Sequence, residues 1–257
     1  MNQDAIKSEI SVKWDTEAEY YDTYVSHGVQ TESEKKLWTE AFNYVLPQDS
    51  RLRILDVGCG TGAMGIILSG TGHDVTGIDL SEKMMDEGRK KAETLRLPMI
   101  FQNGDAENPP FEEESFDVVI NRHLLWTLPN PDTAIANWYR VLKPGGVLIV
   151  IDGQWDDGTL GTQIRRSLSR KIAGIVEKHP HGQTGYTDDI KEALPNIGGL
   201  PEGTAVEYIS SAGFSDVCSR DLMGIRKNQH NRLPWYKRIA AGDSYYLISG
   251  KKAENTL

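Results

Sequence analysis

The sequence has little of several features that identify whole classes of protein. It contains only two cysteines, Cys59 and Cys218, which form neither a disulfide framework nor a metal-binding spacing. His179 and His181 lie two residues apart and do not match the spacing of a zinc site, so no metal site is predicted. A run of roughly 18 apolar residues is also missing. The first residues lack an apolar signal core, and we therefore expect a cytoplasmic protein without a membrane span.

Positive charge is scarce as well. The chain has 37 acidic and 28 basic residues, and the resulting net charge of −9 disfavours nucleic acid as a partner. Neither internal repeats nor low-complexity segments occur. The chain has 257 residues, of which 39% are hydrophobic and 25% charged. These values suit one α/β domain with a sub-domain insertion.

The features that are present are organised around one stretch, Arg53–Gly65. It opens with the apolar run Ile54–Val57, which is typical of a strand buried on both faces. Gly58, Gly60 and Gly62 follow at alternate positions and permit backbone angles that a Cβ would forbid. A helical pattern begins directly afterwards. A strand, a glycine turn and a helix in this order predict a cradle for a nucleotide cofactor, because free N–H groups at the helix start face the ligand.

Two cofactors fit this cradle. Gly60–Gly65 matches G-x-G-x-x-G, and Asp79 lies nineteen residues after Gly60, as in dinucleotide-binding proteins. An NAD-dependent oxidoreductase is therefore one alternative. Asp56 favours another cofactor, because a carboxylate just before the glycines does not help a pyrophosphate but attracts a ligand with an ammonium and a sulfonium.

The run LDVGCGTG, Leu55–Gly62, resembles the first motif of class I S-adenosylmethionine (SAM)-dependent methyltransferases. It is most similar to the ubiquinone/menaquinone-biosynthesis-like small-molecule branch, methyltransferase type 11. The run R-V-L-K-P-G-G-x-L at 140–148 resembles the same superfamily, and the likeness spans roughly residues 14–150 and the final helix and hairpin. It implies transfer of a methyl group from SAM to a small-molecule acceptor by SN2 displacement, with S-adenosylhomocysteine (SAH) as the product. A non-catalytic SAM-binding module is a further alternative.

Several residues are predicted to hold this cofactor. Asp79 ends an expected strand, where its carboxylate can accept from both ribose hydroxyls or cap the next helix, as Ser81 also can. The resemblance implies that Asp105 accepts from the adenine amine, that the Ala106 backbone N–H reaches a ring nitrogen, and that Tyr21 belongs to a lid. The predicted cofactor-binding residues are Tyr21, Asp56, Gly58, Cys59, Gly60, Gly62, Asp79, Leu80, Met84, Asp105, Ala106, Glu107, Asn121 and Arg122.

The acceptor side is predicted from the segment that follows the expected strand 115–121, because ligands bind at the carboxyl ends of strands in open α/β sheets. His123 has an ordinary pKa near neutrality and is the first candidate for a general base, which an alcohol or phenol acceptor needs. The alternative is that it only hydrogen-bonds within the site. Methyltransferases of nucleic-acid or glutamine amino groups carry an Asn/Asp-Pro-Pro-Tyr/Phe motif, and its absence here disfavours those acceptors. The predicted substrate-binding residues are Trp126, Trp155, Arg165 and Tyr186, with Arg166 in the same basic stretch.

The expected fold is α/β, a seven-stranded Rossmann-like methyltransferase sandwich. Its sheet is mostly parallel and closes with an antiparallel C-terminal hairpin from 214–223 and 243–250, whereas a dinucleotide-binding fold ends in a parallel sixth strand. A long excursion from the alternation of strands and helices predicts a helical cap over the acceptor. We expect a monomer or homodimer. The predicted divisions are a helical lid at 1–50, the SAM-binding core at 51–152, the cap insertion at 153–199 and the rest of the core at 200–257.

Overall fold

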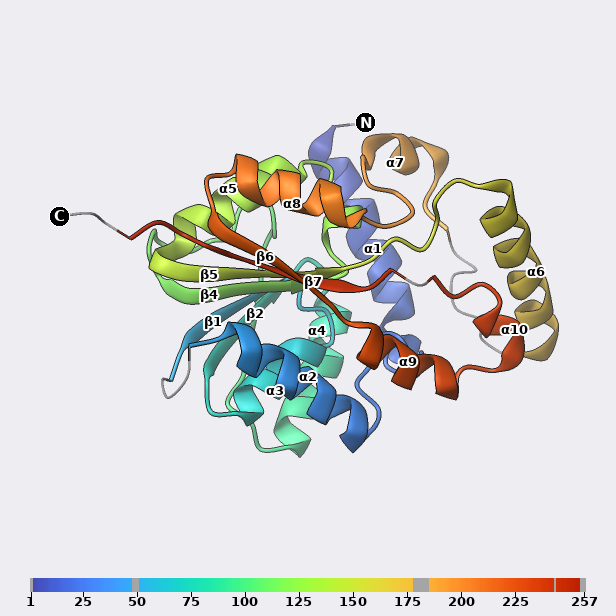
Figure 1. Ribbon diagram of the computed structural model, residues 1–257, viewed down its shortest axis with the longest axis horizontal. Coiled ribbons are helices and arrows are strands. Elements are labelled where there is room, and N and C mark those ends of the chain that lie inside the picture. The colour runs from blue at the N-terminus through green and yellow to red at the C-terminus, as the bar shows by residue number, and fades with distance from the viewer. Residues whose placement is uncertain (1, 48–50, 178–184, 243, 255–257) are drawn as a thin grey trace.

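A seven-stranded sheet forms the centre of the computed structural model, which describes residues 2–47, 51–177, 185–242 and 244–254 (Figure 1). The strand order is β3-β2-β1-β4-β5-β7-β6. The first five strands run parallel, and β7 is antiparallel to both of its neighbours. The strands are β1 (Arg53–Val57), β2 (Asp74–Asp79), β3 (Ile100–Asn103), β4 (Phe116–Arg122), β5 (Leu142–Asp152), β6 (Ser215–Asp221) and β7 (Tyr246–Lys251).

Helices cover both faces of this sheet, and further helices form a cap beyond its end (Figure 1). One face carries α2 (Glu32–Val45), α3 (Ala63–Gly70) and α4 (Glu82–Thr94), and the other carries α5 (Pro131–Val141) and α8 (Glu202–Ser211). Helix α1 (Gln3–Tyr21) packs against α4. The cap contains α6 (Leu160–Val176), α7 (Asp188–Ala193), α9 (Met223–Arg232) and α10 (Trp235–Arg238), and a short 3-10 helix, η1 (Leu125–Thr127), follows β4.

The central strands are apolar throughout because both of their faces are buried. In β1, Ile54 faces the core cluster beneath α2 and α3, while Leu55 faces the cluster beneath α5 and α8. In the paired strand β4, Val118 faces the first of these clusters and Val119 faces the second. Such continuous apolar runs are the pattern of a parallel sheet that has helices on both sides.

The observed topology confirms the predicted fold. Strand β7 pairs antiparallel with β5 and with β6, so the sheet ends in the predicted hairpin and not in a parallel sixth strand. The connection between β6 and β7 contains two helices, α9 and α10. The predicted N-terminal lid, 1–50, contains two different helices. In α2, Trp38 and Phe42 are part of the central core, while α1 crosses to the ligand-binding side.

A buried polar network attaches the cap helix α9 to the core helix α2. The Glu34 carboxylate is 0% exposed and accepts a hydrogen bond from Gln229 Nε2 at 2.8 Å. It also forms an ion pair with the Arg232 guanidinium. A charge removed from water is tolerated when it is paired and hydrogen-bonded in this way. Glu34 therefore fixes the position of a helix that the sequence places almost 200 residues away.

Candidate active site

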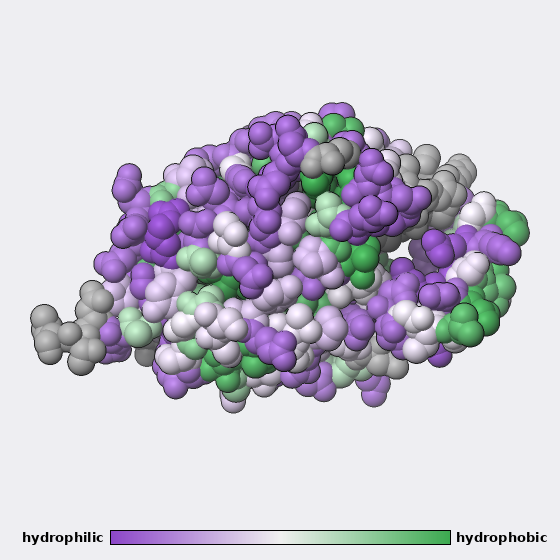
Figure 2. Space-filling model, turned by 90° about the horizontal axis from the view of Figure 1, so that it is seen from above, coloured by the Kyte–Doolittle hydropathy of each residue, from purple (hydrophilic) through white to green (hydrophobic). Residues whose placement is uncertain are grey.

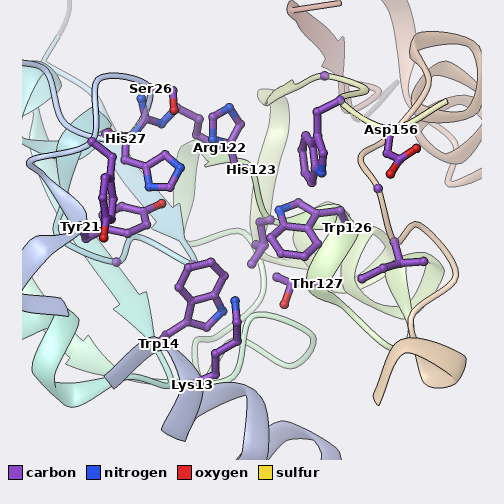
Figure 3. A pocket seen from close by; sticks show the side chains of 18 of the residues that line it. Lys13, Trp14, Tyr21, Ser26, His27, Arg122, His123, Trp126, Thr127 and Asp156 are labelled. Carbon is purple, nitrogen blue, oxygen red and sulfur yellow. Dashed lines mark hydrogen bonds between the residues drawn. The ribbon is translucent and has the colours of Figure 1, made fainter. Parts of the chain in front are cut away.

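A cavity of about 680 Å³ lies at the carboxyl ends of the parallel strands. Its walls come from α1, from the loops after the parallel strands, and from the cap helices α6, α9 and α10. Figure 3 shows aromatic and basic side chains pointing into it from several of these elements. This is the edge at which open α/β sheets bind ligands.

The glycine turn after β1 forms one end of the cavity. Gly58 has φ +63°, and a Cβ there would meet the Leu124 side chain at 2.5 Å. Gly62 has φ +74°, and a Cβ there would meet the Phe101 ring at 2.7 Å. Both positions therefore require glycine for the backbone angle and for space. The Cys59 N–H donates to the Ile78 carbonyl at 3.0 Å, which holds the turn against β2.

Asp79 holds the same turn from the end of β2. Its Oδ2 accepts from the Gly60 N–H at 2.8 Å, and its Oδ1 accepts from the Ser81 N–H at 2.8 Å. Burial raises the pKa of this carboxyl. An ionised carboxylate has about four acceptor sites, so capacity is left for a ligand. The next helix has its own cap, because the Ser81 hydroxyl accepts from the Met84 N–H at 3.2 Å.

The third loop of the cavity is fastened to α1 by an ion pair that the sequence analysis missed. Lys7 Nζ lies 2.7 Å from Asp105 Oδ2 and 2.6 Å from Glu107 Oε2. Glu107 is buried and accepts from the Asn130 N–H at 2.6 Å, so it supports the loop from behind. The Asp105 carboxylate lines the cavity.

Asp56 lies beneath the glycine turn. Its Oδ2 accepts from the Gly65 N–H at 3.0 Å, inside the first turn of α3. Burial raises the pKa of this carboxyl to about 7, although the Gly65 N–H opposes the shift. The residue before α3, Gly62, has no side chain to cap the helix, and Asp56 supplies an acceptor there. That Asp56 attracts the ammonium of the ligand stays a prediction.

The structure brings together most of the residues predicted to hold the cofactor. Those that line the cavity are Tyr21, Gly58, Gly60, Asp79, Leu80, Met84, Asp105, Ala106 and Arg122. Those that lie outside its wall are Asp56, Cys59, Gly62, Glu107 and Asn121. Asn121 is 0% exposed, and neither its Oδ1 nor its Nδ2 has a partner among the described residues.

Arg122 presents a cation to the cavity. Its Nη2 donates to the His27 carbonyl, while its buried Nη1 has no hydrogen-bond partner within the described part of the chain. The His27 ring lies 4.4 Å from the Tyr21 ring, centroid to centroid. Figure 3 shows Tyr21, His27 and Arg122 on one side of the cavity. A buried N–H without a partner is costly, so this group has a strong preference for an acceptor.

His123 follows Arg122 and lines the cavity. Its backbone is left-handed, with φ +56°, and its N–H donates to the Ile151 carbonyl at 2.9 Å. Burial holds the pKa of the imidazole well below its ordinary value, and the Arg122 and Arg226 guanidinium groups act in the same direction. The ring is therefore neutral near pH 7, and the same lowered pKa makes it a weaker base than an ordinary histidine.

Aromatic rings form the opposite end of the cavity. The Trp126 ring lies 5.1 Å from Trp155, 5.8 Å from Tyr186 and 6.1 Å from Trp14, measured between centroids. Lys13 Nζ lies 4.3 Å from the centre of the Trp14 ring and 4.5 Å from that of Tyr186. Burial lowers the pKa of this ammonium.

The predicted cap insertion, 153–199, contributes only some of the residues that were predicted to bind the acceptor. Trp155, Arg166 and Tyr186 line the cavity, whereas Arg165 is exposed on α6 and donates to Thr162 Oγ1 at 3.1 Å. His179 and His181 lie outside the described residues. Within the described ranges, no group of three His, Cys, Asp or Glu residues can hold a metal ion. Lining residues that the sequence analysis missed are Lys7, Lys13, His27, Arg226, Lys237 and Tyr245, which no motif singled out.

Asp152, at the end of β5, is a fully buried carboxyl close to this site. Its Oδ1 accepts from the Gly153 N–H at 2.8 Å, and its Oδ2 has no partner among the described residues. Burial raises the pKa to about 8. In the unfolded chain the same carboxyl titrates near pH 4. Between these values the folded protein keeps a proton that the unfolded chain loses, so this group lowers the free energy of unfolding as pH rises.

We therefore expect Asp152→Asn to remove this pH dependence. The difference in free energy of unfolding, variant minus wild type, should increase by about 1.4 kcal/mol per pH unit between about pH 5 and 7. Above about pH 8 this difference should become constant. Urea unfolding at several pH values measures this difference. The exposed Glu113→Gln variant is the control and should run parallel to the wild type. Parallel curves for Asp152→Asn would contradict the assignment.

Comparison with known proteins identifies the family. Residues 55–150 match the family model described as a methyltransferase domain. The chain is 30% identical over 192 residues to the demethylmenaquinone methyltransferase of Staphylococcus epidermidis, and the match covers 74% of this chain and 78% of that protein. This chain is a class I SAM-dependent methyltransferase. It uses SAM and transfers a methyl group to a small-molecule acceptor.

This methyltransferase is also similar to other methyltransferases, both in sequence and in fold. It is 30% identical over 200 residues to the ubiquinone/menaquinone biosynthesis C-methyltransferase UbiE of Ruegeria sp., covering 74% of this chain and 77% of that one. Among solved structures it is similar to phosphoethanolamine N-methyltransferase 2 of Haemonchus contortus, with a TM-score of 0.66 and 16% identity. That match covers 93% of this chain and 57% of the other, so the methyltransferase spans little more than half of that protein's length.

A second structural neighbour is the [4+2]-cyclase SpnF, with a TM-score of 0.66, 20% identity and 97% of each chain covered. At these identities the structural matches show the fold alone. No helix in the described ranges is both long and apolar enough to cross a membrane. The NAD-dependent alternative is not supported, because the family matches are methyltransferases and the sheet ends in an antiparallel hairpin.

Proposed function

We propose that the acceptor of this methyltransferase is a planar ring that carries an ionisable hydroxyl, such as a phenol or an enol. The observation that carries this proposal is the position of Lys13. Its ammonium lies in the cavity wall over the Trp14 and Tyr186 rings, where burial is the largest influence on its pKa and the charge of Glu17, one turn further along α1, opposes it. A desolvated ammonium of this kind favours an anionic ligand, and a phenolate or enolate is both anionic and able to stack on aromatic walls.

The names of two relatives agree with such an acceptor. One is called a demethylmenaquinone methyltransferase and the other a C-methyltransferase of ubiquinone/menaquinone biosynthesis. A ring carbon next to an ionised hydroxyl is electron-rich, so methylation at carbon and at oxygen both begin from the same anion. The ring would lie among Trp14, Trp126 and Trp155, which all line the cavity.

The cavity also fits the cofactor. The glycine turn is a cradle that a Cβ at Gly58 would fill, and Asp79 retains acceptor capacity for ribose hydroxyls. Arg122 Nη1 is a buried donor with no partner among the residues that the structure describes. We assign Arg122 to the carboxylate of the methionine moiety and Asp105 to the adenine amine. When bound, SAM supplies a methyl group that its sulfonium has already activated.

The protein's own share of the reaction is alignment, exclusion of water and proton handling. Lys13 would hold the acceptor's oxygen as an anion. His123 lines the cavity and would accept the proton when the hydroxyl arrives protonated, although its lowered pKa makes it a weak base. The aromatic walls and the cap would exclude water from the transfer. This division places the charge-stabilising group and the base on different elements, α1 and the loop after β4.

We expect Lys13→Met to lower kcat/KM for phenolic and enolic acceptors roughly 10- to 100-fold, because a charge-assisted hydrogen bond contributes about 1.5–3 kcal/mol. The affinity for SAH should stay unchanged. Assays with labelled SAM and a panel of phenols, catechols and cyclic enols measure the first quantity, and calorimetry with SAH the second. The deficit should shrink as pH rises above the pKa of the acceptor, since the hydroxyl then ionises without help.

Lys36→Met is the matched control, because Lys36 is 79% exposed on α2 and away from the cavity. An unchanged kcat/KM in Lys13→Met would overturn the proposed acceptor class. An equal loss of SAH affinity would show that Lys13 acts on the whole lid and not on the acceptor. The assignment of 1–50 as lid and 153–199 as cap, the cytoplasmic location and the monomeric or homodimeric state remain predictions.

A further inference from the structure

Helix α6 has its large apolar side chains on the outside. Leu160, Ile164 and Ile175 are 77%, 67% and 85% exposed. The residues that α6 buries against the protein are small, namely Thr162, Ser169 and Ala173. A surface helix of a globular protein normally shows the opposite arrangement, with its apolar stripe facing the core. The exposed stripe therefore calls for a separate explanation.

The exposed residues form one continuous stripe. Leu160, Ile164, Leu168 and Ile175 follow at intervals of four, four and seven residues, which places them on one side of an α-helix. We call these four residues the outer stripe. Figure 2 shows apolar side chains gathered at the outer edge of the molecule, at the end that α6 occupies in Figure 1. The neighbouring helix α10 exposes Trp235, which is 65% accessible.

The charges of α6 are all positive. Between 160 and 176 it has four basic residues and no acidic one, although the whole chain carries a net charge of −9. Arg165 and Lys171 are exposed and are not part of the cavity wall. An apolar stripe beside basic residues on an otherwise acidic protein matches a partner that is apolar inside and anionic at its surface.

These observations favour an anionic lipid bilayer over a second copy of the chain. In a two-fold symmetric dimer the same patch meets itself, so the basic residues of one α6 would face those of the other. A bilayer surface with anionic headgroups attracts these residues and accepts the outer stripe at the boundary of its acyl chains. We propose that α6 docks on an anionic membrane surface through the outer stripe.

Docking through α6 would place the acceptor cavity next to the membrane. The docking proposal does not depend on the acceptor class proposed above. Helix α6 also lines the cavity, with Arg166, Ser169 and Ala173. The same helix would therefore touch lipid on one side and the acceptor cavity on the other. Failure of the docking proposal would leave the phenolic or enolic acceptor untouched, because the two proposals use different residues and different assays.

Co-sedimentation of the full chain with lipid vesicles tests the proposal. We expect binding to vesicles of phosphatidylglycerol and phosphatidylcholine, weaker binding to phosphatidylcholine alone, and loss of binding at high salt. The double variant Ile164→Gln and Ile175→Gln should lower the partition coefficient at least roughly tenfold. Lys171→Gln should lower it about fivefold on the anionic vesicles only.

Val12→Gln is the matched control, because Val12 is 60% exposed on a different helix, α1. It should bind vesicles as the wild type does. Unchanged SAH affinity in the double variant would show that the fold and cavity are intact. No sedimentation with anionic vesicles, or an equal loss of binding in Val12→Gln, overturns the proposal. A dimer that Ile164→Gln dissociates, without vesicle binding, would instead assign the stripe to a second copy.

Discussion

Replacing Asp79 with alanine should weaken SAH binding by at least roughly 100-fold and reduce methyl transfer at ordinary SAM concentrations in proportion. The carboxylate satisfies the Gly60 and Ser81 N–H groups, and its loss leaves two donors unpaired at the cofactor turn. Each unsatisfied buried donor costs about 1–3 kcal/mol. The proposed bonds to the ribose hydroxyls would be lost at the same time. Calorimetric titration with SAH measures the lost affinity, and urea unfolding measures the cost of the unpaired donors to the fold.

Two further variants separate the contributions. Asp79→Asn keeps one acceptor oxygen, so it should retain part of the affinity. Asp74→Ala lies at the other end of the same strand, where the carboxylate is 49% exposed and pairs with Arg51, and it should bind SAH as the wild type does. Wild-type affinity in Asp79→Ala would refute the ribose assignment. A circular dichroism spectrum of each variant shows whether the fold survives.

Replacing Glu34 with alanine should reduce the free energy of unfolding by about 3–5 kcal/mol. Its buried carboxylate is the common acceptor for Arg232 and Gln229, so the substitution removes the partner of the Gln229 amide and the counter-charge of the guanidinium, which among the described residues keeps only its bond to Gln30 Oε1 at 3.0 Å. The cost falls on the junction between α2 and α9, and α9 lines the cavity through Arg226 and Gln229. Urea unfolding followed by tryptophan fluorescence measures the change.

Glu40→Ala is the control on the same helix. Glu40 is 57% exposed and lies 4.0 Å from Lys36, so its loss should change the free energy of unfolding by less than about 0.5 kcal/mol. Glu34→Gln keeps one oxygen as acceptor and should fall between the two. A cost below about 1 kcal/mol for Glu34→Ala would mean that the apolar contacts of α2 hold α9 without the network.

The cofactor end and the acceptor end of the cavity rest on different kinds of structure. The Gly58 turn and Asp79 are attached to central strands, which packing and backbone hydrogen bonds fix on both sides. The acceptor end depends on α1 and on the cap, where Lys13 and Trp155 come from segments far apart in the chain. The acceptor is therefore selected by segments attached to the sheet, whereas the cofactor is held by the sheet itself.

The amino-acid sequence by itself determined the strand–turn–helix of the cofactor cradle. These features are local: a glycine at Gly58 or Gly62 is needed for a left-handed backbone, and a continuous apolar run is needed where a strand is buried on both faces. Neighbours in the sequence carry the signal for the cradle, whereas the closing hairpin was expected from the family resemblance and depends on the pairing of β7 with β5 and β6.

Only the tertiary structure decided which side chains reach the cavity. Arg165 and Arg166 are adjacent in α6, yet one is exposed and the other lines the cavity, because successive residues of a helix point about 100° apart. Asp56 precedes the glycines as expected, but its carboxylate turns to the Gly65 N–H beneath the turn. Lys13 reaches the aromatic end only because α1 packs across α4. Contacts between distant segments set these positions, and no local pattern encodes them.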